Sequence, residues 1–373
     1  MIQRPVEPVV TEYLYRKASR AGIPLSGTFE LTPVCNMNCN MCYIRMSKKE
    51  QEAVRPLRTG QEWIELAKKA KDAGMLYLLL TGGEPFMHPE FPYIMEQLHR
   101  MGLVISINSN GTMIDELVVQ WLKETPPVRM NITLYGACDE TYKRLCGNPN
   151  GFTQVNRAIL LLRQAGIEVK INCSITPYNK EDIPEIVEYA RRNHLQIQPA
   201  AYMFPPLRKD TSMVGKNNRL SAEDAAYYTV YTDYLIYGKE NFLNRIAKMS
   251  FPSECEDSCA ETGEGVRCRA GKCSFWITWD GKILPCGMFL TSQVKNVFEE
   301  DFQESWELVK QETAQIRLPV QCAGCSIKDQ CHACAAMVYT ESGCFEKVPS
   351  YRCEMMKSIP KQCKAIENKI KEN

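Results

Sequence analysis

The chain has 373 residues, 45% of them hydrophobic and 24% charged, and its formal net charge is +1. This length suits one large domain plus a smaller one, and the balanced charge gives no reason to expect nucleic acid or a membrane surface as a partner. Residues 1–12 contain no long apolar run, so we expect neither a signal peptide nor a membrane span and place the protein in the cytoplasm.

Short apolar runs alternate with helical patterns over the first part of the chain. The helical patterns include a capping box formed by Thr59 and Glu62, ahead of an apolar face that begins at Trp63. The runs are rich in leucine or β-branched residues, as parallel strands are, and lie at 28–31, 76–80, 104–108, 130–134, 169–175 and 197–202. Six alternating β and α units predict an α/β fold, a partial (β/α)6 TIM-like barrel.

The composition changes after Met203. A polar segment rich in helix breakers leads to a helix that Ser221 caps and that runs to about Tyr237. From Phe251 onward cysteines become dense, which indicates a small domain held together by metal ligands more than by a core. The predicted organisation is an N-terminal segment, a partial barrel, a linker with a helix and a cysteine-rich domain, at 1–25, 26–205, 206–250 and 251–373.

The chain contains 18 cysteines. Because no export signal is evident, clustered cysteines indicate metal ligands more often than disulfides. Three isolated cysteines, Cys138, Cys146 and Cys173, lie within apolar stretches, and we expect them to be small buried side chains.

The first cysteine cluster follows the first predicted strand. Cys35, Cys39 and Cys42 have the spacing C-x3-C-x2-C. Three thiolates this close can bind three irons of a cubane and leave the fourth iron open, as a catalytic site requires. The position also fits, because sites in α/β folds lie at the carboxyl ends of strands. The alternative is a zinc knuckle, which usually has a fourth Cys or His nearby, whereas the next histidine is His88.

This triad resembles the signature of the radical S-adenosylmethionine (SAM) superfamily. The resemblance implies a [4Fe–4S] cluster on Cys35, Cys39 and Cys42 whose open iron chelates SAM. One electron then cleaves SAM into methionine and a 5′-deoxyadenosyl radical. Relatives usually carry an aromatic residue before the third cysteine; this chain has Met41 there and Tyr43 after the cysteine, and we expect both to contact SAM.

Further SAM contacts are implied by the same resemblance. Gly82, Gly83 and Glu84 stand in a Gly-Gly-Glu-Pro sequence one βα unit after the triad, where relatives hold the amino group of the methionine moiety. Paired glycines let the backbone approach a ligand closely. The other expected contacts are Asn108, Thr133, Arg144 and Ser174. For the arginine, a solvated position on a helix face is the alternative.

Two more groups of cysteines follow in the C-terminal part. Cys268, Cys273 and Cys286 flank an Asp-Gly turn between two β-rich runs, which predicts a hairpin that returns the third cysteine toward the first two. The second group has the spacing C-x2-C-x5-C-x2-C, followed by one more cysteine: Cys322, Cys325, Cys331, Cys334 and Cys353. Eight cysteines suffice for two fully ligated [4Fe–4S] clusters. A zinc ribbon built from the two C-x2-C pairs is the alternative.

This region resembles the SPASM domain of peptide-modifying radical SAM enzymes, such as the anaerobic sulfatase-maturing enzymes. The resemblance implies interleaved ligation. The first auxiliary cluster would use Cys268, Cys273, Cys286 and Cys334, and the second Cys322, Cys325, Cys331 and Cys353. Cys334 follows a gap of two residues where the family usually has three, and Cys344 is an alternative to Cys353. Cys255 and Cys259 form a further pair to which we assign no role.

The sequence thus predicts an enzyme with three [4Fe–4S] clusters that cleaves SAM and abstracts hydrogen from a substrate. The resemblance favours a ribosomal peptide or protein side chain that is crosslinked, epimerised or oxidised, and a reducing partner such as flavodoxin or ferredoxin. The short N-terminal segment leaves no room for a separate peptide-recognition domain, so a small-molecule substrate is the alternative. An electron carrier or cluster scaffold is a second alternative, but neither needs an open-iron triad followed by Gly-Gly-Glu-Pro.

Overall fold

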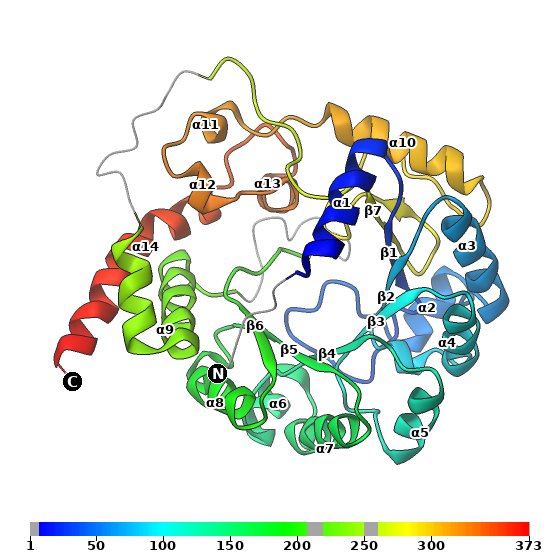
Figure 1. Ribbon diagram of the computed structural model, residues 1–373, viewed down its shortest axis with the longest axis horizontal. Helices are drawn as coiled ribbons and strands as arrows, with labels where there is room; N and C mark the ends of the chain where they lie inside the picture. The colour runs from blue at the N-terminus through cyan, green and yellow to red at the C-terminus, as the bar shows by residue number, and fades with distance from the viewer. Residues whose placement is uncertain (1–6, 207–218, 250–259, 373) are drawn as a thin grey trace.

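A computed structural model describes residues 7–206, 219–249 and 260–372 (Figure 1). In this part of the chain, one sheet of eight strands has the order β6-β5-β4-β3-β2-β1-β7-β8. The strands are β1 Ser26–Glu30, β2 Tyr77–Thr81, β3 Val104–Ser109, β4 Arg129–Thr133, β5 Val169–Ser174, β6 Gln196–Ala200, β7 Ser274–Ile277 and β8 Ile283–Leu284. Neighbours from β6 to β7 are parallel, and β8 runs antiparallel to β7.

The predicted partial barrel is confirmed by β1 to β6, which form a continuous parallel array. Figure 1 shows the helices on the outer side of the curved sheet. The elements that connect these strands are α2 Lys48–Val54, α3 Gly60–Asp72, η1 Pro85–Met87, α4 Phe91–Arg100, α5 Glu116–Glu124, α6 Asp139–Cys146, α7 Gly151–Gln164, η2 Lys180–Asp182 and α8 Ile183–Arg192.

Helix α3 shows how the sequence pattern produces this packing. The predicted capping box is present: the Thr59 side chain accepts from the Glu62 amide at 3.2 Å, and the Glu62 carboxylate accepts from the Thr59 amide at 2.7 Å. These bonds satisfy amides that the first turn leaves unpaired. Trp63 is then fully buried and its ring lies 5.2 Å from that of Phe29 on β1. The helix is thereby fixed against the strand that precedes the cysteine triad.

The remaining helices lie at the two ends of the described chain. They are α1 Val9–Ala21, α9 Ala222–Ala247, α10 Phe302–Gln315, α11 Val320–Ala323, α12 Lys328–Cys331, α13 Ala335–Ser342 and α14 Ser350–Glu372. Ser221 caps α9 as predicted, but the helix continues past Tyr237 to Ala247 across a kink at Gly238. Helix α14 packs along α9. No helix in the described ranges is both long and apolar enough to cross a membrane.

The predicted hairpin is confirmed by β7 and β8, which flank Asp280 and Gly281. Strand β7 also pairs with β1, with Ser26 opposite Ser274, so the C-terminal region extends the barrel sheet. Phe275 of β7 belongs to the same buried core cluster as the barrel strands. The C-terminal region therefore shares a core with the barrel, and its proposed boundary at residue 251 stays a prediction.

Candidate functional site

The loop after β1 carries the cysteine triad and packs directly on the loop after β2. The Gly83 amide donates to the Thr32 carbonyl at 2.7 Å, and the Glu84 amide donates to the Val34 carbonyl at 2.9 Å. A Cβ on Gly83 would lie 2.5 Å from the Val34 carbonyl oxygen, which no side chain tolerates. Glycine is therefore required where the second loop supports the backbone just ahead of Cys35.

Glu84 connects the loop after β2 to the end of β3. Its buried carboxylate accepts from the Ser109 hydroxyl at 2.9 Å, the Asn110 amide at 2.8 Å and the Phe86 amide at 3.3 Å. Burial raises the pKa of Glu84 to about 7, against the opposing effect of these hydrogen bonds. The carboxylate is thus already engaged by the protein, in a structural role.

Backbone amides point at two of the three triad thiols. The Met37 amide donates to Cys35 Sγ at 3.4 Å, and the Arg45 amide donates to Cys42 Sγ at 3.3 Å. Burial raises the pKa of Cys35 to about 12, and the neighbouring charges of Cys39 and Cys42 add to that effect. Amide donors stabilise thiolate sulfur, and cluster-binding loops supply such donors.

The third thiol, Cys39, receives side-chain hydrogen bonds from Cys146 and Tyr135, which lower its pKa. The loop is held there by its backbone, because the Asn38 amide donates to the Cys146 carbonyl at 2.9 Å. Cys146 is buried as expected, and it also contacts a triad thiol, which the sequence did not indicate. Sequence reasoning also missed Tyr135, which follows β4 by two residues.

A second neighbour of the triad is Asn110, just after β3. Its side-chain amide lies 3.6 Å from Cys35 Sγ and donates to the Asn36 side chain at 2.9 Å. The Asn-Gly pair at the end of a predicted strand marks this turn, but the sequence contains no sign that it meets the triad.

The donor set fits a [4Fe–4S] cluster with one open iron. Cys35, Cys39 and Cys42 are mutual electrostatic neighbours and carry hydrogen-bond donors on their sulfurs. Within the described ranges, no three His, Cys, Asp or Glu side chains are arranged around a single metal ion. A cubane does not need that convergence, because each thiolate binds a different iron.

The other residues expected to contact SAM lie around the same end of the sheet. Met41 and Tyr43 are half-buried in the triad loop. Asn108, Thr133 and Ser174 stand at or next to the carboxyl ends of β3, β4 and β5.

Arg144 is exposed on α6, where it donates to the Tyr178 carbonyl at 2.7 Å. Of the isolated cysteines, Cys173 is buried as predicted. The prediction for Cys138 is wrong, because this residue is exposed at the start of α6.

Four C-terminal cysteines line one cavity: Cys322, Cys325, Cys331 and Cys353. Burial raises the pKa of Cys322 to about 11, and the charges of the other three thiols act in the same direction. Arg267 and Lys328 also line this cavity, and both form ion pairs with Glu264. Cys344 is not among the lining residues. The cavity therefore brings together the set expected for the second auxiliary cluster.

The set expected for the first auxiliary cluster is gathered around Cys268. Burial raises the pKa of Cys273 and that of Cys334, and the charge of the exposed Cys268 thiol acts in the same direction on both. Cys286 lines the same cavity as Cys268, beside α1. From α1, Ser19 Oγ lies 2.9 Å from Cys273 Sγ. Cys255 and Cys259 lie outside the described residues.

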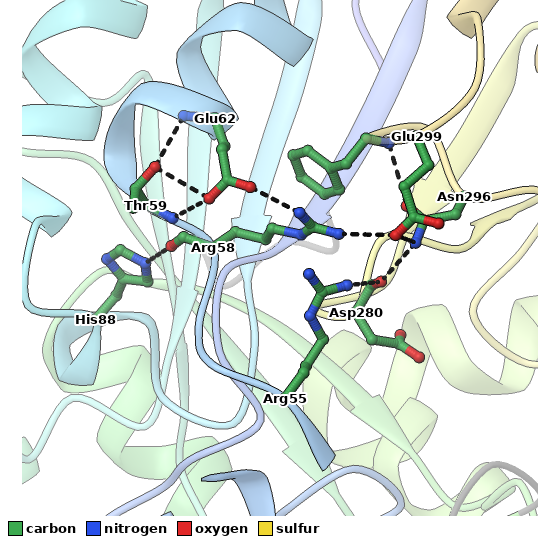
Figure 2. A network of polar contacts seen from close by, with 9 residues as sticks. Arg55, Arg58, Thr59, Glu62, His88, Asp280, Asn296 and Glu299 are labelled. Carbon is green, nitrogen blue, oxygen red and sulfur yellow. Dashed lines mark hydrogen bonds and ion pairs between the residues drawn. The ribbon is translucent and has the colours of Figure 1, made fainter.

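A polar network ties the segment between α2 and α3 to the C-terminal hairpin turn and the residues that follow it (Figure 2). Arg58 contacts Glu62 at 2.7 Å and Glu299 at 3.4 Å, and its backbone carbonyl lies 2.9 Å from His88 Nε2. Arg55 donates to the Asp280 carbonyl in the hairpin turn at 3.0 Å. The network joins the segment between α2 and α3, the end of η1 and the C-terminal region.

Comparison with known proteins agrees with this geometry. Residues 29–190 match the family model described as the radical SAM superfamily. An AdoMet-dependent heme synthase of Methanosarcina barkeri is 25% identical over 332 residues, which cover 84% of this chain and 92% of the relative. The antilisterial bacteriocin subtilosin biosynthesis protein AlbA of Bacillus subtilis is 25% identical over 287 residues, which cover 75% of this chain and 59% of AlbA.

Among solved structures, native anSMEcpe with bound AdoMet and the Cp18Cys peptide superposes with a TM-score of 0.66 at 19% identity, covering 93% of this chain and 99% of that one. At this identity the likeness shows the fold alone. The matching family model, the triad at the carboxyl end of β1 and the partial barrel agree with one another. Residues 29–190, which include the triad and most of the barrel, therefore match the radical SAM superfamily, a family that implies a [4Fe–4S] cluster and S-adenosylmethionine.

Proposed function

We propose that the chain is a radical SAM maturase that modifies a side chain of a peptide or protein and carries three [4Fe–4S] clusters. In this proposal Cys35, Cys39 and Cys42 hold the SAM cluster. The auxiliary clusters use the two sets named above, Cys268, Cys273, Cys286 and Cys334, and Cys322, Cys325, Cys331 and Cys353. A SAM-bound cluster of this kind supplies a 5′-deoxyadenosyl radical, which takes a hydrogen atom from the substrate.

The observation that carries the proposal is the cavity lined by Cys322, Cys325, Cys331 and Cys353. Cleavage of SAM alone needs only the triad. Further thiol sets are useful when hydrogen abstraction is followed by loss of an electron, because oxidation of the substrate then requires an acceptor. A fully ligated cluster suits electron transfer, since it has no open iron for a substrate.

The remaining roles in the proposal belong to side chains around the triad. Gly82 and Gly83 are half-buried, and the side of their backbone that does not pack on the triad loop would meet the methionine moiety. Met41 and Tyr43 in the triad loop would pack on the adenosyl end. Glu84, because its oxygens are engaged, would act by holding the two loops in place. Polar contacts to SAM would come from Asn108, Thr133, Ser174 and, after a change of rotamer, Arg144.

Two comparisons support a peptide substrate: AlbA is a bacteriocin biosynthesis protein, and anSMEcpe binds the Cp18Cys peptide. A flavodoxin or ferredoxin would supply the electron. A small-molecule substrate is the second candidate. It is favoured by the heme synthase, since the alignment covers 92% of that relative but only 59% of AlbA.

The test begins with anaerobic reconstitution. The proposal predicts about twelve irons per chain, and release of 5′-deoxyadenosine with SAM and dithionite. Zinc in place of iron in the C-terminal region would contradict the auxiliary clusters. The substrate class is then decided by what accelerates 5′-deoxyadenosine release: short peptides encoded beside the gene, or the small-molecule fraction of a host extract.

A further inference from the structure

The inner face of the barrel sheet carries a row of polar side chains. Asn108, Asn131, Lys170 and Gln196 are consecutive Cα partners across β3, β4, β5 and β6. Their neighbours along the strands, such as Ile132 and Ile171, belong to the hydrophobic core, and the helices cover the outer side of the sheet (Figure 1). Since successive side chains alternate between faces, the polar row points into the barrel.

This row is buried but incompletely paired. Asn131 and Lys170 are 6% and 8% exposed. Asn131 donates to the Asn108 side chain at 2.9 Å, and Lys170 donates to the Gln198 side chain at 2.8 Å. The side-chain oxygens of Asn131 and Gln196 are buried without a hydrogen-bond partner in the described part of the chain. A closed barrel fills its interior with branched apolar residues, and buried polar groups are normally paired, so this arrangement fits a ligand.

The charge on this face is positive. Burial lowers the pKa of Lys170 to about 8, and the charge of Arg129, which precedes Asn131 on the same face of β4, acts in the same direction. Neither cation forms an ion pair with a carboxylate in the described ranges, and Arg129 Nε is buried without a partner. The inner-face carboxylate of Glu30 lies on β1, where it accepts from the Trp276 indole at 2.6 Å.

We propose that Lys170 and Arg129 form a subsite for a carboxylate of the substrate. This inference rests on the proposed function and names a chemical feature of its substrate. Two cations and side-chain amide donors are the groups that recognise a carboxylate. On β5, Lys170 lies two residues before Asn172, which belongs to the row of Thr133, Asn172 and Gln198. Its Cα therefore lies about 7 Å closer to the amino ends of the strands than that row. The substrate would therefore enter the barrel carboxylate first, with its reacting carbon toward the triad end.

The methionine moiety of SAM also carries a carboxylate, which is the second ligand that these two cations could bind. SAM is expected at the carboxyl ends of the strands, whereas Arg129 opens β4 at the opposite end. The depth of the subsite favours the substrate, and the experiment separates the two sources.

The test measures access to Lys170 in the reconstituted holoenzyme. Lysines are dimethylated with formaldehyde and dimethylamine–borane, and labelling of Lys170 is read by mass spectrometry relative to exposed Lys68 on α3. Glutarate is the carboxylate probe, and neutral glutaramide is its control. With SAM bound, glutarate should reduce labelling of Lys170 several-fold while glutaramide does not. Arg129→Met should abolish this protection, and Arg129→Lys should keep most of it.

Equal labelling with and without glutarate, or equal protection by the two probes, would overturn the proposal. Strong protection by SAM alone, together with weaker SAM binding by Lys170→Met in equilibrium dialysis, would assign the cations to the cofactor and overturn the substrate subsite. The labelling does not depend on turnover. A chain that binds glutarate here but releases no 5′-deoxyadenosine would refute the proposed function and leave the subsite standing.

Discussion

The Cys146 side chain forms a hydrogen bond with Cys39, the middle cysteine of the triad. Cys146 is the last residue of α6, and a backbone bond from Asn38 to the Cys146 carbonyl keeps the two cysteines together. The Tyr135 hydroxyl reaches the same sulfur. One corner of the proposed SAM cluster thus has two side-chain donors.

The first prediction concerns reduction potential. Donors to a cluster sulfur favour the reduced, more negatively charged cluster and raise its potential. Cys146→Ala should therefore make the SAM-responsive cluster harder to reduce, and Cys146→Ser should recover part of the loss. Tyr135→Phe should act in the same direction. The measurement is a redox titration followed by electron paramagnetic resonance. Cys363→Ala, another buried cysteine but on α14, is the control. An unchanged potential in Cys146→Ala would show that this thiol only packs.

The second prediction separates the triad from the C-terminal sets. Replacing Cys35, Cys39 and Cys42 together by Ala should leave about eight of about twelve irons. The variant should stay brown and form no 5′-deoxyadenosine, because the remaining clusters are fully ligated and offer SAM no open iron. Release of 5′-deoxyadenosine by this variant above a no-enzyme control, with dithionite as reductant, would refute the role of the triad.

The third prediction tests the cavity that four C-terminal cysteines line. Cys322→Ala with Cys325→Ala should remove about four irons and leave reductive cleavage of SAM intact. Cys344→Ala is the matched control, because Cys344 lies outside the cavity lining, and it should retain full iron content. Loss of iron in the control instead would make Cys344 the ligand in place of Cys353.

The fourth prediction concerns pH. Burial raises the pKa of Glu84 from 4.5 to about 7. Between these values the folded chain binds more protons than the unfolded chain, so stability falls as pH rises. Between about pH 5.5 and 8, the free energy of unfolding of the wild type should fall by about 2 kcal/mol relative to that of Glu84→Gln. Thermal unfolding of both proteins across this range measures the difference, and parallel pH profiles would contradict it.

The fifth prediction concerns the network in Figure 2. The Arg58 side chain is 11% exposed, and its guanidinium lies 4.3 Å from the centre of the Phe298 ring. Arg58→Met should destabilise the chain by about 2 kcal/mol, because the change removes the guanidinium that packs on Phe298 and breaks its contacts with Glu62 and Glu299. Arg157→Met, which breaks an exposed pair with Glu116, should leave the thermal midpoint nearly unchanged. Equal effects in the two variants would mean that the network adds no stability.

Features that depend on neighbouring residues were predictable from the sequence. The capping box of Thr59 and Glu62 involves residues three apart, and the strands follow from local apolar runs. The cysteine triad is equally local, because its spacing alone limits what it can bind.

Features that depend on tertiary packing were not predictable. Cys146 meets Cys39 only because α6 ends beside the triad loop. The pairing of Ser26 with Ser274 joins segments that are far apart in the sequence, and no periodicity in either segment indicates its partner. The inner-face cations likewise become neighbours only through the strand register, since Arg129 and Lys170 are far apart in sequence.

The pairing of β7 with β1 has a consequence for how this protein can be divided. Without residues 251–373, β1 would become an open sheet edge with unpaired amides and carbonyls, and Phe275 would no longer cover its side of the core. Such an edge is a template for aggregation. The cysteine-rich region is thus also the lateral boundary of the barrel, so a shortened version consisting of the catalytic barrel alone should precipitate on expression.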